Sequence, residues 1–260
     1  MKIITCLKEV PDRDTRYEID AAGTSINQED LTFSINECDE YALEESLKLK
    51  EKHGGEVVIL TLGREKAERS VRKGLAMGAD RAILVKDDAE QISNPHAVAQ
   101  VLSQVLREEE YDLILAGTQS DDFSYAQTGV ILAELLGLSH ATIVMEIEAE
   151  SKTRKVKALR EMESGWFQWV EMSMPTVLTV QAGISQVRYV SLRGIMQAKK
   201  KEIRKIDLVD LNIEFDAIPS IEVVRLYFPE AETRAEILEG EPQEVVEELV
   251  ERLKTDRKVL

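Results

Sequence analysis

The chain has 260 residues, of which 43% are hydrophobic and 32% are charged, a composition typical of a folded, water-soluble protein. Its formal net charge of -16 argues against nucleic acid as a partner, because phosphate backbones are bound by basic surfaces. No apolar run approaches the ~20 residues of a membrane span, and the first ten residues resemble a strand rather than a leader peptide. We therefore expect a cytoplasmic protein without membrane insertion.

The first half of the chain alternates short apolar runs with amphipathic stretches. The apolar runs predict strands at Ile3–Leu7, Val57–Leu62, Ala82–Val85 and Leu113–Ala116. Because these runs are uninterrupted, they are typical of strands buried on both faces of a parallel sheet. The amphipathic stretches predict helices at Glu37–His53, Arg64–Met77, Pro95–Glu109 and Tyr125–Leu136. Strands that alternate with helices predict right-handed crossovers, so we expect a doubly wound, mostly parallel α/β sheet.

Two segments depart from this alternation. Residues 13–27 contain YEID-AAGT-SIN, which predicts a small hairpin with a glycine-containing turn. Residues 141–172 alternate apolar and polar positions, which predicts an antiparallel extension with strands at Thr142–Ile147, Lys155–Met162 and Trp166–Met172. One more buried strand, Thr176–Val180, follows Pro175.

The C-terminal residues are predicted to form a separate part. A short loop, a helix and the basic run KKK are followed by a polar, weakly periodic stretch and then by an amphipathic helix at Pro242–Lys254. A helix so far from the main domain is expected either to fold back onto that domain or to pack on another chain. We therefore divide the chain into an α/β domain over residues 1–190 and a partner-binding arm over residues 191–260.

The residue types that bind metals or form disulfides give no pattern here. Cys6 and Cys38 are the two cysteines of the chain, and reduced thiols are expected. His53, His96 and His140 lack the spacing of metal ligands, so no metal site is predicted.

The segment LILAGTQSDDFSYAQTGVILAELLG is the strongest candidate for a ligand site. A buried strand ends at Gly117, a polar loop follows, and Gln127, Thr128 and Gly129 lie near the start of a helix. Ligands of open α/β sheets bind outside the carboxyl ends of strands, and helix N-termini attract phosphate. The absence of a P-loop lysine and of a GxGxxG motif disfavours a triphosphate with magnesium and a Rossmann dinucleotide. The segment predicts either a nucleotide site, with Gly129 allowing close approach to a phosphate, or an ordinary polar loop.

Two neighbouring segments end at the same edge of the predicted sheet. Cys6 closes the first strand and is expected to line the site through its backbone, as a small buried residue. Asn36 precedes the first long helix, where its side chain either caps that helix or contacts an adenine or ribose.

Several long motifs resemble the β subunit of electron transfer flavoproteins. ALREMESGWFQWVEMSMPTVLT follows the family signature at Arg160, Glu163, Gln168, Val170 and Pro175 to Thr179. RYVSLRGIMQAKKK, LAMGADRAILV and SINECDEYALEE are similar to its recognition loop, the segment before its third core strand and the entry to its first helix. The matches run in order from Lys2 to Lys201. One departure is Ser164, where the signature has Gly, Asp or Glu in a turn that also tolerates Ser.

This resemblance implies an electron carrier subunit without catalytic residues of its own. The family is a heterodimer in which the larger α subunit binds most of a redox-active FAD. The smaller subunit has an adenine nucleotide α hydrolase-like fold and binds AMP, and the electron donors are acyl-CoA or amine dehydrogenases. Carried over to this chain, the nucleotide site would comprise Cys6, Asn36, Glu37, Cys38, Asp39, Leu62, Gly117, Thr118, Gln119, Ser120, Asp121, Asp122, Phe123, Ser124, Tyr125, Ala126, Gln127 and Thr128.

Two further residues match partner-binding positions of the family. Leu192 matches the leucine that anchors in an apolar pocket of the dehydrogenase, whereas packing in the core is the alternative interpretation. Glu161 matches a glutamate that faces the mobile flavin domain of the α subunit and pairs with an arginine. A solvated strand residue is the alternative for Glu161.

Three other functions remain as alternatives. Electron-bifurcating relatives carry a second FAD in place of AMP and resemble DGDTAQVG in the loop, where this chain has DFSYAQTG. Because Phe123 and Tyr125 add bulk there, AMP is expected. The chain could also be a stand-alone adenine-nucleotide binder of the universal-stress or nucleotide-hydrolase type. The third alternative is a structural subunit with an empty cleft.

Overall fold

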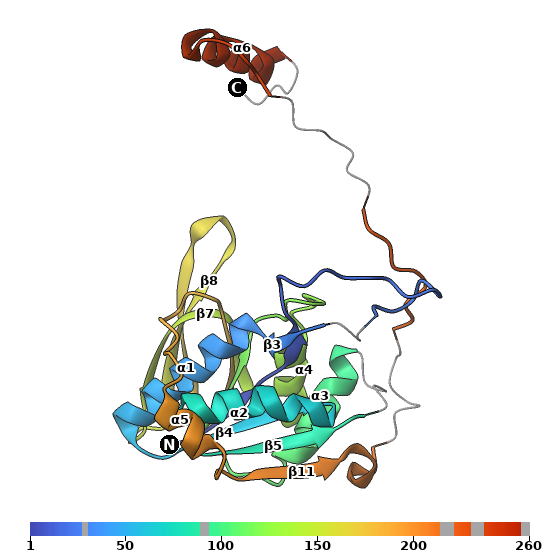
Figure 1. The fold of residues 1–260 in the computed structure, drawn as a ribbon. Coiled ribbons are helices and arrows are strands. Elements are labelled where there is room, and N and C mark those ends of the chain that lie inside the picture. The colour runs from blue at the N-terminus through green and yellow to red at the C-terminus, as the bar shows by residue number, and fades with distance from the viewer. Residues whose placement is uncertain (28–30, 89–93, 214–220, 230–236, 256–260) are drawn as a thin grey trace. The chain divides into compact units, whose positions relative to one another are not determined.

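A computed structural model describes residues 1–27, 31–88, 94–213, 221–229 and 237–255 (Figure 1). The chain divides into two compact units, and each is described by itself. The larger unit comprises residues 1–18 and 26–223, and the smaller comprises residues 19–25 and 224–260.

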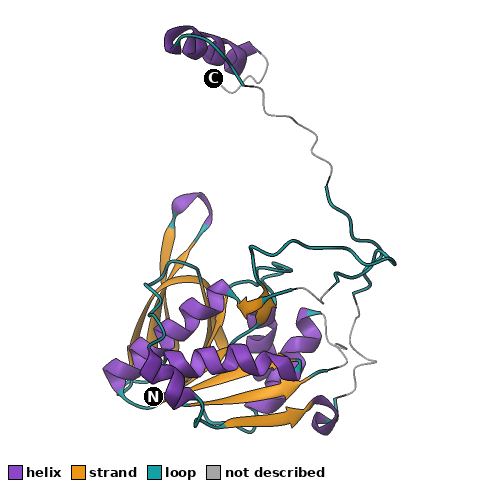
Figure 2. Ribbon diagram, viewed as in Figure 1, coloured by secondary structure: helices purple, strands orange, loops and turns teal. Residues whose placement is uncertain are grey.

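The described part of the larger unit is built on a nine-stranded sheet of order β11-β5-β4-β1-β6-β10-β7-β8-β9 (Figure 2). The strands are β1 Lys2–Cys6, β4 Glu56–Gly63, β5 Arg81–Lys86, β6 Leu113–Gly117, β7 Ser139–Glu150, β8 Lys155–Glu161, β9 Phe167–Ser173, β10 Thr176–Val180 and β11 Ile203–Asp207. Neighbouring strands from β11 to β7 pair in parallel, whereas β8 and β9 are antiparallel. The predicted sheet with its antiparallel extension is confirmed.

Helices cover both faces of this sheet. They are α1 Glu37–His53, α2 Glu68–Met77, α3 Pro95–Leu106, α4 Thr128–Leu136 and α5 Leu192–Ala198, with short 3-10 turns at Glu65–Ala67, Glu163–Gly165 and Leu208–Leu211. Apolar residues of α1, α2 and α5 share one core cluster, and those of α3 and α4 share the other. The sheet is therefore doubly wound.

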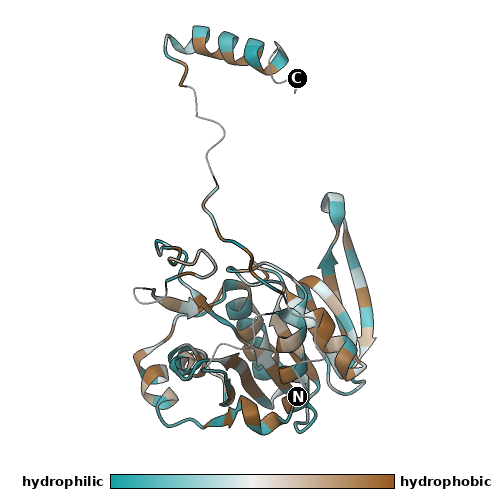
Figure 3. Ribbon diagram, turned by 90° about the vertical axis from the view of Figure 1, so that its right-hand side faces the viewer, coloured by the Kyte–Doolittle hydropathy of each residue, from teal (hydrophilic) through white to brown (hydrophobic). Residues whose placement is uncertain are grey.

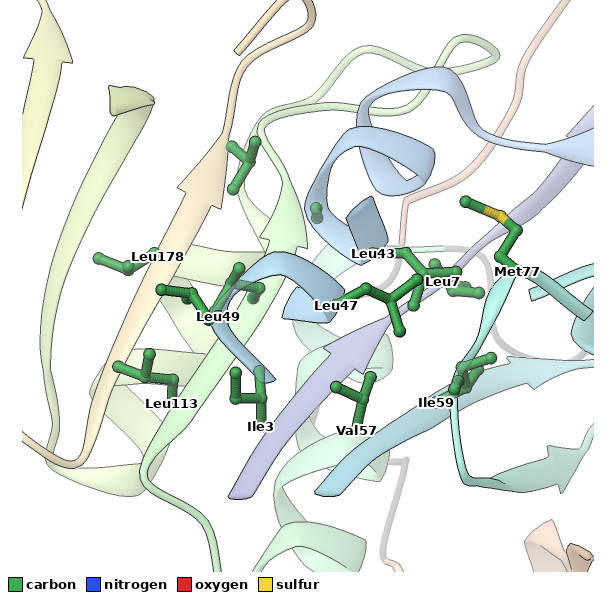
Figure 4. Packing of buried hydrophobic residues seen from close by; sticks show 14 of the residues in the cluster. Ile3, Leu7, Leu43, Leu47, Leu49, Val57, Ile59, Met77, Leu113 and Leu178 are labelled. Atoms are coloured by element: carbon green, nitrogen blue, oxygen red, sulfur yellow. The ribbon is translucent and has the colours of Figure 1, made fainter. Parts of the chain in front are cut away.

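Successive residues of the central strands are buried on opposite faces of the sheet. In β1, Ile3 belongs to the cluster under α1 and α2, and Ile4 belongs to the cluster under α3 and α4. Figure 4 shows Ile3 and Val57 on neighbouring strands beside Leu47 of α1. Because both faces are buried, the strands are apolar at every position, and truncating such a side chain to alanine costs about 2–5 kcal/mol.

The strand β7 links the parallel sheet to the antiparallel extension. Its first residues pair in parallel with β10, and its later residues pair with β8 in antiparallel register. The register shifts near Val144, where Ile143 has a positive φ of 55°. Hydrophobic and hydrophilic residues alternate along the extension (Figure 3), as expected for strands with one face in solvent.

Three local features differ from the predictions. The strand β11 lies in the polar stretch after Lys201, where no strand was predicted, and it groups residues 191–213 with the sheet rather than with the arm. It is an edge strand with exposed Arg204 and Lys205, so its sequence lacks the continuous apolar run by which the buried strands were predicted. The short strands β2 Glu9–Pro11 and β3 Phe33–Ile35 form a second, two-stranded sheet that was also missed.

The smaller unit contains a turn and a helix. In the turn, the Asp20 amide donates to the Ser25 carbonyl, and Gly23 has a φ of 72°, as the predicted glycine-containing turn requires. The helix α6 spans Pro242–Thr255, which agrees with the predicted Pro242–Lys254. Its apolar residues Val246, Leu249 and Val250 are exposed.

Candidate functional site

The predicted nucleotide-site residues gather at the carboxyl ends of β1 and β6. These strands are neighbours, yet β1 continues through α1 to β4 on its other side. The order of strands therefore reverses between β1 and β6, and open α/β sheets bind ligands outside the strand ends at such a switch point. We call the region between the ends of β1 and β6 and the start of α1 the crevice. Cys6 ends β1, Gly117 ends β6, and residues 36–39 start α1 at the same edge.

Asn36 holds the loop that follows β6. Its side chain is 1% exposed and makes no cap bond to α1. Instead its Nδ2 donates to the Gln119 carbonyl at 2.9 Å, and its Oδ1 accepts from the Asp121 amide at 2.9 Å. The capping interpretation is therefore wrong. A residue of the loop pairs with the start of α1 instead. The Asp121 carboxylate accepts from the Glu37 amide at 3.2 Å, and its negative charge interacts favourably with the helix dipole.

Asp39 is buried at the start of α1, and both oxygens of its carboxylate accept backbone N–H groups. Its side chain is 6% exposed, Oδ2 accepts from the Lys8 amide at 2.8 Å and Oδ1 accepts from the Gly117 amide at 2.7 Å. Burial raises the pKa of Asp39 to about 7 although these hydrogen bonds act in the opposite direction. Gly117 is required here, since a Cβ on it would lie 2.5 Å from Asp39 Oδ1 and 2.7 Å from the Cys38 Cβ.

Both cysteines of the candidate site are buried free thiols. Burial, followed by the negative charge of Asp39, raises the pKa of Cys6 to about 12 and also raises the pKa of Cys38. Their thiols are therefore neutral near pH 7, which disfavours a role as nucleophile. Cys6 is buried at the end of β1, and Leu62 near the end of β4 packs against the core under α3 and α4.

Two cationic side chains form ion pairs with the loop that follows β6. Lys8 Nζ contacts the Asp122 carboxylate at 2.6 Å and Ser120 Oγ at 3.3 Å. Although burial acts against it, the Lys8 ammonium lowers the pKa of Asp122. Arg13 contacts Asp121 at 2.6 Å and also pairs with Glu37. Neither cation was among the predicted site residues; the position of Lys8 directly after a buried strand was the available signal.

The middle of the loop presents two aromatic rings. Phe123 and Tyr125 are 50% and 40% exposed, and their rings are stacked with centroids 5.6 Å apart and an interplanar angle of 2°. Lys8 Nζ lies 4.9 Å from the centroid of the Phe123 ring. Ser124 and Ala126 have positive φ values of 52° and 55°, so the loop is held in a conformation that such residues seldom adopt.

These positive φ values also set the start of α4. The helix begins at Thr128 rather than at the predicted Tyr125, because a left-handed residue cannot continue a right-handed helix. Its N-cap residue, Gln127, makes no side-chain cap bond, so the first N–H groups of α4 are available to an anion. Gly129 also allows α4 to pack closely on β10, since an added Cβ would lie 2.4 Å from Thr179 Cγ2.

One polar atom of the loop has no partner among the described residues. Thr118 donates its backbone N–H to the Val180 carbonyl at 2.9 Å, but its Oγ1 is buried without a hydrogen bond. Buried hydroxyls are rarely left unpaired, so Thr118 Oγ1 is a candidate ligand contact. Of the remaining predicted residues, Gln119 is exposed.

The segment around Leu192 is exposed to solvent, while the helix that begins at Leu192 is capped and packed on α2. Leu192 is 82% exposed, so the core-packing interpretation is wrong. Ser191 Oγ accepts from the Gly194 amide at 3.0 Å and caps α5. A Cβ on Gly194 would lie 2.4 Å from the Ala76 carbonyl oxygen, so α5 packs closely on α2.

Arg188 fixes the chain just before this helix. Its guanidinium contacts the buried Glu44 carboxylate at 2.8 and 2.9 Å and Glu51 at 2.7 Å, both on α1. Tyr189, directly after it, is 98% exposed. The loop therefore displays apolar side chains from a backbone that is tied to α1.

The comparisons with known proteins agree with this architecture. The electron transfer flavoprotein domain matches residues 24–211. The chain is 36% identical over 257 residues to the electron transfer flavoprotein subunit beta of Methylophilus methylotrophus, covering 96% of this chain and 97% of that protein. It is 35% identical to the Bacillus subtilis subunit beta and 38% identical to that of Bradyrhizobium diazoefficiens, each over 263 residues and 100% of both chains.

The chain belongs to the electron transfer flavoprotein family. Its matches place it with the β subunits, whose role is electron transfer within a heterodimer. Among the described residues, no helix is both long and apolar enough to cross a bilayer, and no three His, Cys, Asp or Glu side chains group as metal ligands.

An electron transfer flavoprotein β subunit has a partner chain, and the antiparallel extension exposes apolar side chains of the kind that partners cover. Glu161 ends β8, and the turn that follows contains Ser164 and Gly165 with φ values of 60° and 77°. Trp166 and Trp169, on and beside β9, are exposed. Glu161 is half-buried at the base of this turn.

Proposed function

We propose that this electron transfer flavoprotein subunit binds AMP as a structural nucleotide at the carboxyl ends of β1 and β6. Its α subunit holds most of the FAD, which supplies the redox centre of the complex. The β chain itself contributes a scaffold and a docking surface rather than catalytic residues. Its expected cytoplasmic location stays a prediction.

The convergence of three segments at one switch point carries this proposal. Residues 117–128, residues 36–39 and Cys6 come from separate parts of the sequence and meet at the same edge of the sheet. This is where open α/β sheets bind nucleotides. In the proposed site, the first turn of α4 holds the phosphate through its N–H groups, and Thr118 Oγ1 supplies a further hydrogen bond.

The loop favours AMP over a second FAD. Phe123 and Tyr125 place two stacked rings in the middle of the loop, where bifurcating relatives have smaller residues. We propose that this bulk leaves no room for a second isoalloxazine ring, while a ring face remains for contact with adenine.

A stand-alone hydrolase is disfavoured by the arrangement of charges. The lysine nearest the loop, Lys8, is engaged by Asp122 and Ser120 rather than aimed at an open site. Cys6 and Cys38 are kept protonated by burial, so they do not supply a nucleophile. These contacts suit a binding site rather than a reacting one.

Equilibrium binding tests this proposal. The complex with the α subunit, stripped of its nucleotides and reloaded with one FAD, is titrated calorimetrically with AMP, ADP, ATP and FAD. We expect AMP to bind one site and a second FAD not to bind. Preferred binding of a second FAD would favour the bifurcating type, and failure of every adenylate would favour the purely structural subunit. Hydrolysis of ATP by the β chain alone would favour the hydrolase.

We further propose that Leu192 anchors in an apolar pocket of a dehydrogenase of the acyl-CoA or amine type. Leu192 is exposed at the start of a capped helix, which suits a side chain that enters a partner and leaves again. Glu161 is proposed to face the flavin domain of the α subunit and to pair there with an arginine.

A further inference from the structure

The Asp39 carboxylate occupies the centre of the proposed site and yet is out of reach of a ligand. It is 6% exposed, and each of its two oxygens already accepts a backbone N–H. The residue therefore serves the site in another way than by contact with a nucleotide.

The two amides that Asp39 binds belong to opposite walls of the crevice. The Lys8 amide lies just after β1, and the Lys8 ammonium in turn holds Asp122 of the loop. The Gly117 amide ends β6 and begins that same loop. One side chain of α1 thus fixes the separation of both walls where they leave the sheet.

We propose that Asp39 is the positioning residue of the adenylate site, acting through the Lys8 and Gly117 backbones rather than through the nucleotide. This inference rests on the proposed AMP-binding function. Without the two bonds, residues 117–127 lose their fixed start, and the first turn of α4 is no longer held at one distance from β1.

The chemistry of the site requires a carboxylate. A carboxylate offers an acceptor on both oxygens, whereas a carboxamide in the same place offers one acceptor and turns its NH2 group toward the second backbone N–H. The close approach also requires Gly117, because a Cβ there would lie 2.5 Å from Asp39 Oδ1. Asn36, one turn earlier, holds the loop further along at Gln119 and Asp121.

A matched control lies at the opposite edge of the sheet. Asp112 Oδ2 accepts from the Lys2 amide at 2.8 Å and joins the same two strands, β1 and β6, at their amino ends. The substitution Asp112→Asn therefore removes a comparable carboxylate far from the crevice.

The experiment compares wild type, Asp39→Asn and Asp112→Asn as full-length chains in complex with the α subunit. After nucleotide removal, AMP binding is measured by calorimetry and the protection of residues 117–127 by hydrogen exchange. We expect Asp39→Asn to bind AMP about tenfold more weakly, because a buried N–H loses its charged acceptor, and to exchange faster in the loop. Asp112→Asn is expected to match wild type in both measurements.

A pH profile separates positioning from general support of the fold. The groups facing Asp39 are the thiols of Cys6 and Cys38 and the Lys8 ammonium, and the raised pKa values keep both thiols protonated near neutral pH. We expect loop protection in the nucleotide-free wild type, corrected for intrinsic exchange, to rise between about pH 6 and about pH 8 as Asp39 ionises. Local opening of the loop removes the two hydrogen bonds that favour the carboxylate while Asp39 stays buried, whereas global unfolding exposes it to water and has the opposite pH dependence. Asp39→Asn is expected to lack this rise.

The outcomes distinguish the two proposals. If Asp39→Asn binds AMP as tightly as wild type does, the positioning role is overturned while AMP binding stands. If the wild-type complex binds no AMP, the proposed function and this inference fall together. Should Asp39→Asn fail to fold, loop protection in wild type that is unchanged across the pH range contradicts the positioning role.

Discussion

At the carboxyl ends of β1 and β6, buried polar side chains are hydrogen-bonded to the backbone. Around α5, by contrast, apolar side chains are exposed to solvent. Asn36 and Asp39 use their side-chain oxygens to hold the loop after β6 and the end of β1 in place. Leu192 and Tyr189 contribute little to their own chain and stand on a base tied down by Arg188. A site for a retained nucleotide benefits from rigid walls, while a surface for a transient partner needs exposed area on a fixed support.

The largest effect is expected where the walls of the crevice approach most closely. Gly117→Ala places a Cβ 2.5 Å from Asp39 Oδ1, so the substitution must push the loop away from α1. We expect a loss of about 3 kcal/mol in the free energy of unfolding, measured by urea denaturation, and loss of AMP binding. Gly63→Ala at the end of β4 is the control, because an added Cβ there meets Ala67 at an ordinary 3.4 Å. Similar losses in both variants would contradict the close-approach argument.

The proposed docking surface around Leu192 is expected to respond in the opposite way. Leu192→Ala removes an exposed side chain, so stability and AMP affinity should be unchanged, while electron transfer from the dehydrogenase slows roughly tenfold, since a buried leucine contributes about 1.5–3 kcal/mol. Stopped-flow reduction of the flavin measures this rate. Val209→Ala, another exposed apolar truncation, is the control. Equal rates for Leu192→Ala and wild type would exclude Leu192 as the anchor.

The titration of Asp39 is expected to give a smaller effect, on stability. Burial raises its pKa to about 7 in the folded chain from 3.8, so the folded state binds this proton more tightly than the unfolded state does. The stabilisation that follows is fully present below about pH 4 and is lost as pH rises through about 7. The free energy of unfolding of wild type relative to Asp39→Asn should therefore fall by about 2 kcal/mol between about pH 5 and about pH 7. A difference that is constant with pH would show that Asp39 does not titrate in this range.

The smallest effect is expected at Glu161. A charge pair at a surface contributes about 0–1 kcal/mol, so Glu161→Gln should slow electron transfer at most a few-fold and reduce its dependence on salt. The measurement is the transfer rate at low and high ionic strength, with Glu148→Gln on β7 as the control. An unchanged salt dependence would indicate that Glu161 makes no charge pair with the α subunit.

The sequence predicted the sheet because its central strands are buried on both faces and are therefore apolar at every position, as at Ile3 and Ile4. It missed β11, since an edge strand with exposed Arg204 and Lys205 has no such pattern. It also assigned Asn36 a possible cap, because local spacing cannot show that the loop 83 residues later in the chain takes its side-chain amide.

The position of the candidate site followed from the strand ends, but its internal bonds did not. Asp39 and Gly117 are 78 residues apart, and nothing near either residue in the sequence indicates their hydrogen bond. The start of α4 was placed too early for a similar reason, as the positive φ values of Ser124 and Ala126 follow from contacts of the loop rather than from residue type.

The proposed role of the crevice can be tested by counting nucleotides in the intact complex. The chain is co-expressed with its α subunit, the complex is denatured, and the released nucleotides are separated by chromatography and quantified against protein. We expect one FAD and one AMP per heterodimer. Two FAD molecules, or one FAD without any AMP, would contradict the assignment of the crevice between β1 and β6 to AMP.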